Sequence, residues 1–147
     1  MKYLGIDYGT KYVGTAIGDD ETAFALPLQS FTYTDDKKLF ADLIALIQSE
    51  DIESIVVGIP RMGSVSEDIV ARIENFVKKL HEESGLPVTT ADESFTSLEA
   101  QKRLSGRKGK NDDHAVAAML ILQGYFDYMS FPPLGDTRDK LRRESSK

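Results

Sequence analysis

The most informative motif in this chain reads Gly5-Ile6-Asp7-Tyr8-Gly9-Thr10-Lys11-Tyr12-Val13-Gly14-Thr15-Ala16. It places one carboxylate, that of Asp7, at the end of a short apolar run, and a Gly-Thr turn and a second apolar run follow at once. Asp is a poor strand residue, so its position indicates either a turn or a chemical role. The glycines let the backbone turn tightly and approach a ligand closely. Such an Asp can hold a metal ion against a phosphate, which points to phosphoryl chemistry on a nucleotide or a nucleic acid.

The rest of the chain predicts how this motif is embedded. Three strands are expected at 2–7, 11–18 and 22–33, and their short connections predict an antiparallel meander, with Pro27 indicating an edge position or an irregularity. Helices and strands then alternate: a helix capped by Asp35 or Asp36, a strand at 52–58, a helix after Ser66 that ends at Ser84-Gly85, a strand at 86–91, a helix from Thr96 or Ser97 to about Leu104, and a helix from Asn111 to about Met129. This order predicts an α/β fold. Its five-stranded mixed sheet, a three-stranded antiparallel meander plus two parallel strands, is flanked by helices.

Length and composition set the broad class. The 147 residues predict one domain over 1–135, followed by a polar, flexible tail at 136–147. No apolar run approaches the ~18 residues of a membrane span, and the first residues do not resemble a secretory signal. The chain has no cysteine, which fits a reducing compartment. We therefore expect a cytoplasmic protein without a membrane partner. The net charge of −6 argues against a generic DNA-coating protein.

Several acidic residues are expected at one edge of the sheet. In open α/β sheets, ligands gather beyond the carboxyl ends of the parallel strands. These ends are predicted at Asp7, at Gly58-Ile59-Pro60 and at Asp92-Glu93. The last helix would overhang them, because its sheet-facing stripe counts back from Tyr125 through 121/122 and 117/118 to position 114. That stripe favours His114 over Asp113, which points ~100° away around the helix, although an irregular first turn would let both reach a metal.

If these side chains converge, their chemistry follows. Oxygen ligands without cysteine suit Mg²⁺ or Mn²⁺. Two such ions ~3.5–4 Å apart clamp the attacking and leaving oxygens of a phosphodiester displacement. Flanking phosphates would be held by the turn and by nearby cations, for which the candidates are Thr10, Lys11, Arg61, Arg107, Lys108 and Lys110.

Each candidate also has a purely structural explanation. Asp7 could be a turn residue, and Asp92 or Glu93 could cap a helix. Asp112 and Asp113 are good first-turn helix residues on dipole grounds, and the cationic run 102–110 could be solvated surface. The functional hypothesis therefore depends on convergence, which capping does not require.

Four motifs, in order, resemble those of a known family. They are the 5–16 motif, Val56-Val57-Gly58-Ile59-Pro60 with Gly63, Asp92 to Ala100, and Ala117 to Tyr125. With them the chain resembles the YqgF/RuvX family over nearly its whole length. These RNase H-like proteins are related to the Holliday-junction resolvase RuvC and are viewed as nucleases for the 5′ end of pre-16S rRNA. The resemblance implies an RNase H-like fold, with Asp7 as the first catalytic acid and Glu93 as the second.

Two positions depart from the family pattern. Ser94 stands where members usually have Arg, and the third acid of the family falls at His114, with Asp113 beside it. The resemblance thus implies a catalytic and metal-binding set of Asp7, Glu93, Asp113 and His114, in which either of the last two could be the third ligand.

Three functions remain open from the sequence. The first is a Mg²⁺- or Mn²⁺-dependent nuclease of structured nucleic acid that processes pre-16S rRNA, or alternatively a resolvase-like nuclease of branched DNA. The second is an ATP-binding module, because the Asp-x-Gly-Thr turn also opens actin- and hexokinase-type ATPases, but no second copy of the motif is present. The third is a non-catalytic ribosome-assembly or RNA-binding factor. The expected partners are pre-rRNA or branched DNA and pre-ribosomal particles, and the protein would be a monomer or a homodimer.

Overall fold

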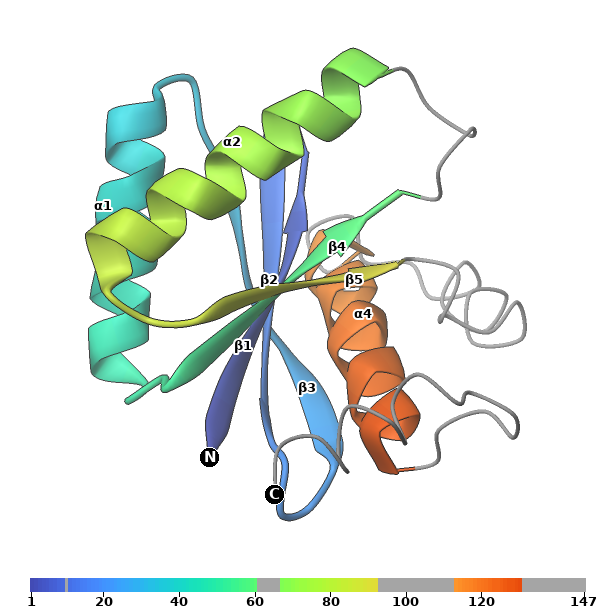
Figure 1. Ribbon diagram of the computed structural model, residues 1–147. Helices are drawn as coiled ribbons and strands as arrows, with labels where there is room; N and C mark the ends of the chain where they lie inside the picture. Colours follow the sequence, from blue (N-terminus) through green and yellow to red (C-terminus); the bar gives the residue numbers. More distant parts are fainter. Residues whose placement is uncertain (10, 61–66, 93–112, 131–147) are drawn as a thin grey trace, which may run out of the picture.

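The five predicted strands form one mixed sheet. A computed structural model describes residues 1–9, 11–60, 67–92 and 113–130. Its strands are β1 (Lys2–Tyr8), β2 (Tyr12–Asp19), β3 (Phe24–Thr32), β4 (Ser54–Ile59) and β5 (Val88–Asp92). The spatial order is β3-β2-β1-β4-β5 (Figure 1). β1, β2 and β3 pair in antiparallel fashion, whereas β4 is parallel to both β1 and β5. The predicted meander with two added parallel strands is therefore confirmed.

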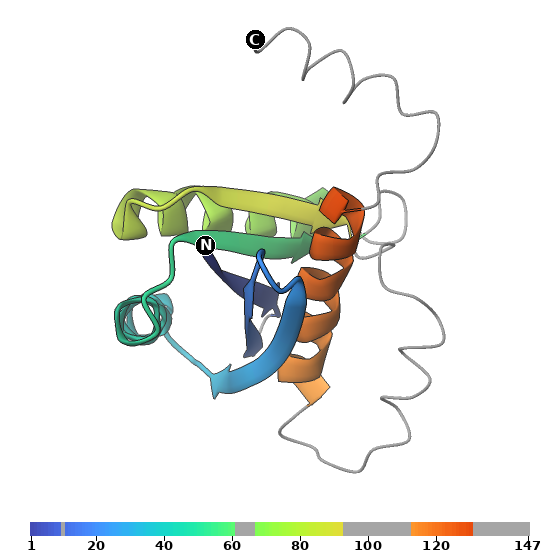
Figure 2. The same cartoon turned by 90° about the horizontal axis from the view of Figure 1, so that it is seen from below.

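Within the described residues, three helices cover the two faces of this sheet. They are α1 (Asp36–Ser49), α2 (Glu67–Ser84) and α4 (Asp113–Ser130). The turned view in Figure 2 shows α1 and α4 on opposite sides of the strands. The predicted helix ends are confirmed for the first two: Asp35 accepts a hydrogen bond from the Lys37 N–H (2.9 Å), and Gly85 follows α2 with φ of 71°. The helix predicted over 96–104 lies outside the described residues.

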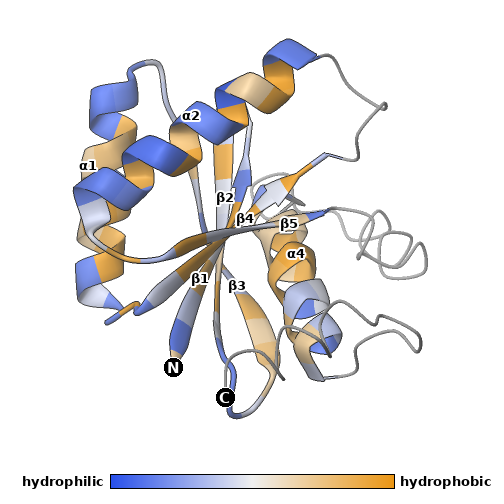
Figure 3. Cartoon of the chain, viewed as in Figure 1, coloured by the Kyte–Doolittle hydropathy of each residue, from blue (hydrophilic) through white to orange (hydrophobic). Residues whose placement is uncertain are grey.

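The alternation of side chains along β1 divides the core into two layers. Leu4 and Ile6 are fully buried against α1 and α2, whereas Tyr3 packs in the layer beneath α4. Figure 3 shows the apolar stripes of the helices turned toward the strands. Successive strand residues point to opposite faces. Asp7 therefore lies on the α4 face of the sheet, and Tyr8 lies on the face of α1 and α2.

The edge strand β3 is irregular near Pro27, as predicted. The pairing of β2 with β3 shifts between Gly14 and Ala16. Thr15 occupies the shift: its buried hydroxyl donates to the Gln29 carbonyl (2.6 Å) and accepts from the Gln29 N–H (3.0 Å). A side-chain hydroxyl thus replaces the missing ladder bonds.

The described helices are also unsuited to a bilayer. None of α1, α2 and α4 is both long enough and apolar enough to cross a membrane.

Candidate active site

Asp7 is the centre of the candidate site. It is the second-last residue of β1, pairs with Gly14 of β2, and is partly buried under the start of α4. Burial raises the pKa of the Asp7 carboxyl above its usual 3.8, and the electrostatic influence of the nearby His114 acts in the opposite direction. The ionised carboxylate is therefore poorly solvated, and a cation at this place would stabilise it.

Glycines and small side chains bring α4 onto the backbone of the sheet. A Cβ at Gly14 would collide with the backbone carbonyl of His114, so only glycine lets the first turn of α4 lie there. At Gly5, a Cβ would come within 2.8 Å of the Leu122 Cβ and 3.0 Å of the Ala118 carbonyl oxygen. The close approach places the beginning of α4 beside Asp7.

The stripe of α4 that faces the sheet agrees with the prediction at Ala118, Ile121 and Leu122 and differs from it at the two ends. Its buried members are Ala115, Ala118, Ile121, Leu122 and Phe126. The prediction counted from Tyr125, which is only partly buried, whereas Phe126 is the buried anchor. His114 consequently lies at the margin of the stripe, where it is half-buried and still close enough to Asp7 to influence its charge.

An aromatic partner that the sequence reasoning missed orients His114. The rings of Tyr12 and His114 stack with centroids 4.8 Å apart and an interplanar angle of 11°. Tyr12 is 45% exposed, so its outer face remains open to solvent. An uncharged residue at the start of a strand carries no functional signal by itself, and its role is visible only in this contact.

A second missed residue, Tyr33, holds the turn that follows Asp7. Its hydroxyl donates to the Gly9 carbonyl (2.6 Å), and its N–H donates to the Lys11 carbonyl (3.1 Å). The Gly9 N–H in turn donates to the Tyr12 carbonyl (2.9 Å). Burial raises the pKa of Tyr33, so this phenol stays protonated as a donor. Gly9 and Lys11 are therefore both tied to Tyr33, the residue that follows β3.

The parallel strand β5 places Asp92 away from Asp7. Asp92 is in register with Ile59, at the carboxyl end of its strand as predicted. Its neighbour Ala91 packs in the layer beneath α4, so Asp92 points to the opposite face of the sheet. This member of the Asp92-Glu93 pair does not join Asp7.

The remaining candidates are only partly visible. Lys11 is exposed beside the turn, and Asp113 begins α4, with its side chain outside the description. Thr10, Arg61, Glu93, Arg107, Lys108 and Lys110 lie outside the described residues. Among the side chains that are described, no group of three or more Asp, Glu, His or Cys is placed to hold a metal ion. The structure thus brings together one carboxylate and one imidazole.

Solved structures define the class to which this fold belongs. RuvC of T. thermophilus in complex with a Holliday junction substrate superposes with a TM-score of 0.66 at 16% identity, covering 90% of this chain and 97% of that chain. The fowlpox virus resolvase in complex with Holliday junction DNA gives 0.56 at 14% identity, over 88% of this chain and 99% of that chain. At such identities the likeness establishes the fold alone, which is the RNase H-like fold of these resolvases.

Sequence comparison then gives the family. The profile of RuvX, described as Holliday junction resolvase, matches residues 1–128. A protein of Lawsonia intracellularis named "Putative pre-16S rRNA nuclease" is 40% identical over 86% of this chain and 94% of its own length. A protein of Pseudomonas syringae with the same name is 39% identical over 84% of this chain and 90% of its own length. The chain belongs to the RuvX family, which confirms the resemblance inferred from its motifs.

Proposed function

We propose that this protein is a nuclease that hydrolyses phosphodiester bonds in structured nucleic acid, with Asp7 at the centre of its active site. One observation carries the proposal: the partly buried Asp7 lies at the carboxyl end of β1, and its strand partner Gly14 packs against the backbone of His114 in the first turn of α4. A turn residue needs neither burial nor a helix packed directly above it. The carboxylate pays a desolvation penalty that a bound cation would remove.

The donor set fits a divalent metal ion. A carboxylate oxygen suits Mg²⁺ and Mn²⁺, and an imidazole nitrogen beside it is better matched to Mn²⁺. We propose that Asp7 and His114 hold the ion. When bound, the ion would neutralise charge on the scissile phosphate and lower the pKa of a water molecule. The Tyr12 ring keeps the imidazole in place, and the Tyr33 hydroxyl keeps the adjoining turn in shape.

The other members of the proposed set follow from the family pattern. Because Asp92 points away from Asp7, Glu93 is the member of that pair assigned as the second acid. Asp113 is retained as an alternative third ligand beside His114. The proposed phosphate contacts are Thr10, Lys11, Arg61, Arg107, Lys108 and Lys110. Removing the Thr10 hydroxyl or neutralising any one of the five cations is expected to weaken binding.

The relatives suggest the substrate. Their shared name favours precursor 16S rRNA, which would place the protein in the cytoplasm and in contact with pre-ribosomal particles. The family description and the resolvase fold favour branched DNA as the second candidate. If Asp7 proved unnecessary for activity, a non-catalytic role in ribosome assembly would be the better explanation.

The test is a cleavage assay with matched substrates. A fragment spanning the 5′ end of pre-16S rRNA and a four-way DNA junction are incubated with Mg²⁺ or Mn²⁺ and either the wild type or Asp7→Asn. We expect metal-dependent cleavage of the RNA that Asp7→Asn reduces by more than about 100-fold, because even partners of metal ligands are worth roughly 10–100-fold. Cleavage that survives in Asp7→Asn would sink the proposal, and preferential cleavage of the junction would reassign the substrate.

A further inference from the structure

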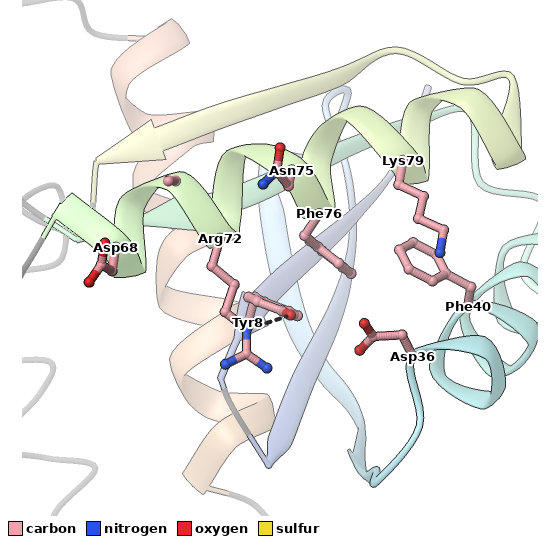
Figure 4. Close-up of a pocket in the computed structure, with 9 residues that line it drawn as sticks. Tyr8, Asp36, Phe40, Asp68, Arg72, Asn75, Phe76 and Lys79 are labelled. Atoms are coloured by element: carbon pink, nitrogen blue, oxygen red, sulfur yellow. Dashed lines mark hydrogen bonds between the residues drawn. The ribbon is translucent and has the colours of Figure 1, made fainter.

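A groove lies on the face of the sheet opposite Asp7. It has a volume of about 390 Å³ and is bounded by α1, α2 and the end of β1 (Figure 4). Tyr8, which follows Asp7 directly in the chain, forms part of its wall. Because Tyr8 and Asp7 are neighbours at the end of β1 and point to opposite faces, the groove and the candidate active site lie on the two sides of the same strand end.

The floor of the groove consists of packed aromatic rings. Tyr8 stacks on Phe76 with centroids 4.2 Å apart and an angle of 18°, and Phe40 packs against Phe76 at 5.4 Å. Both phenylalanines are buried, whereas Tyr8 is only partly buried, and all three line the groove. The accessible part of this floor is therefore mainly the Tyr8 ring, an apolar surface for a flat or sugar-like group.

Charged side chains form the rim. Arg72 and Lys79 stand two turns apart on α2, with Asp68 on the same helix and Asp36 across the groove on α1 (Figure 4). Within the described part of the chain, the ion pairs of 4.0 Å or less join only the N-terminal ammonium to Asp19 and Asp20. The two cations and two carboxylates of the groove therefore share one rim without forming an ion pair with one another.

The two cations are positioned by aromatic contacts that leave their charged groups able to bind a ligand. The Arg72 Nε donates to the Tyr8 hydroxyl at 3.4 Å, which leaves the other donors of the guanidinium free for a ligand. The Lys79 Nζ lies 4.8 Å from the centre of the Phe40 ring. Both head groups are thus positioned at the groove by aromatic residues of its floor.

We propose that this groove binds a single-stranded segment of the nucleic acid substrate, continuous with the strand that passes Asp7. Arg72 and Lys79 would contact its phosphates, and the Tyr8 ring would contact its sugars and bases. Asp36 and Asp68 accept hydrogen bonds, which unpaired bases offer through N–H groups that a duplex keeps for its own pairing. The proposal rests on the proposed function, because it extends the same substrate around the end of β1.

The chain offers a matched pair of lysines for the test. Lys79 lines the groove, whereas Lys78 is equally a lysine of α2, is exposed, and does not line it. Binding of a fluorescein-labelled RNA hairpin, with or without a single-stranded oligouridine extension at either end, is measured by anisotropy over a series of salt concentrations. The proteins compared are the full-length wild type, Lys79→Gln, Lys78→Gln and Lys79→Arg.

We expect the extension to tighten binding by the wild type. Lys79→Gln should lose this gain and lower the slope of log K against log salt by ~0.7, the value for one phosphate contact on a single strand. Lys78→Gln should keep the gain from the extension and the wild-type salt slope. Lys79→Arg should keep them too, because it retains the positive charge. Thermal melts check that all variants fold.

Two results would overturn the groove proposal: no benefit of an extension at either end, or equal slopes for Lys79→Gln and Lys78→Gln. Cleavage is followed separately with Asp7→Asn. If the wild type cleaves and the salt slopes of Lys79→Gln and Lys78→Gln are equal, the proposed function stands and the groove proposal fails. If no cleavage is seen but the salt slopes of Lys79→Gln and Lys78→Gln differ, the groove stands as a binding site and the nuclease assignment fails.

Discussion

The backbone carbonyl of His114 occupies the space that a Cβ of residue 14 would need, and Gly14 has no Cβ. Gly14 is also the residue of β2 that pairs with Asp7. One glycine therefore sets the distance between the helix that carries His114 and the strand that carries Asp7. The site depends on this close approach of backbones as much as on the two functional side chains.

Gly14→Ala should accordingly damage both stability and activity. The added Cβ meets backbone atoms that cannot rotate away, so α4 must shift, at a cost of about 1–3 kcal/mol. Gly58→Ala is the control, because the atoms nearest to its Cβ would be side-chain atoms of Ile121, chiefly the terminal Cδ1, rather than backbone atoms. Urea unfolding and cleavage rates are compared for the two variants. If the two variants lost equal amounts of stability and activity, the contact between residue 14 and the His114 backbone would have no particular importance for the site.

Removing the Asp7 charge should stabilise the protein in a pH-dependent way. The native Asp7 carboxyl holds its proton to higher pH than the usual 3.8, because burial penalises its charge. Between the two pKa values the native state binds more protons than the unfolded state, so the free energy of unfolding falls as pH rises through that window. Asp7→Asn avoids this loss. Its melting temperature should exceed that of the wild type near neutral pH, and the difference should vanish in acid.

The control for this prediction is the exposed Glu82→Gln on α2, which removes an equal charge far from the site. It should not reproduce the pH dependence. Thermal melts of the three proteins between pH 3 and pH 8 are the measurement. A constant difference between Asp7→Asn and the wild type at every pH would contradict the assigned effect of burial.

The two histidines of the chain allow a direct test of the metal ligand. His114→Gln should lower the affinity for Mn²⁺ by at least about 10-fold, since the imidazole lies beside Asp7. His81 is the control, because its Nδ1 lies 2.7 Å from the Leu86 carbonyl at the end of α2, remote from the site. Calorimetric titration with Mn²⁺ compares His114→Gln with His81→Gln. If Asp113→Asn lowers the affinity and His114→Gln does not, the third ligand is Asp113.

Tyr33→Phe should loosen the turn after Asp7 without removing any of the proposed ligands. It deletes one hydroxyl that donates to the Gly9 carbonyl, and a hydrogen bond of this kind is worth about 0.5–1.5 kcal/mol. Hydrogen exchange at the Gly9 amide should become faster, because its bond to the Tyr12 carbonyl closes the same turn. Tyr125→Phe is the matched control, since its hydroxyl bonds to no other residue in the described chain. Unchanged exchange at the Gly9 amide in Tyr33→Phe would mean that the Tyr33 hydroxyl does not stabilise this turn.

Most of the fold could be predicted from the sequence because the responsible signals are local. Alternation and short turns determine the meander, and helical spacing determines α1, α2 and α4. Pro27 marks the irregular edge strand, and Gly85 ends α2. The order of strands and helices then places Asp7 at the carboxyl end of a parallel strand, where ligands gather.

Only the tertiary structure decided which side chains meet there. Whether His114 lies at the centre or the margin of its helix stripe depends on how Gly14, Gly5 and Phe126 seat α4, and periodicity alone predicted the middle of the stripe correctly but not its two ends. The ring of Tyr12 against His114, the hydroxyl of Tyr33 on Gly9, and the groove beneath Arg72 each join segments that are distant in the chain. Such contacts follow from packing of whole elements, whereas sequence patterns report what each element does by itself.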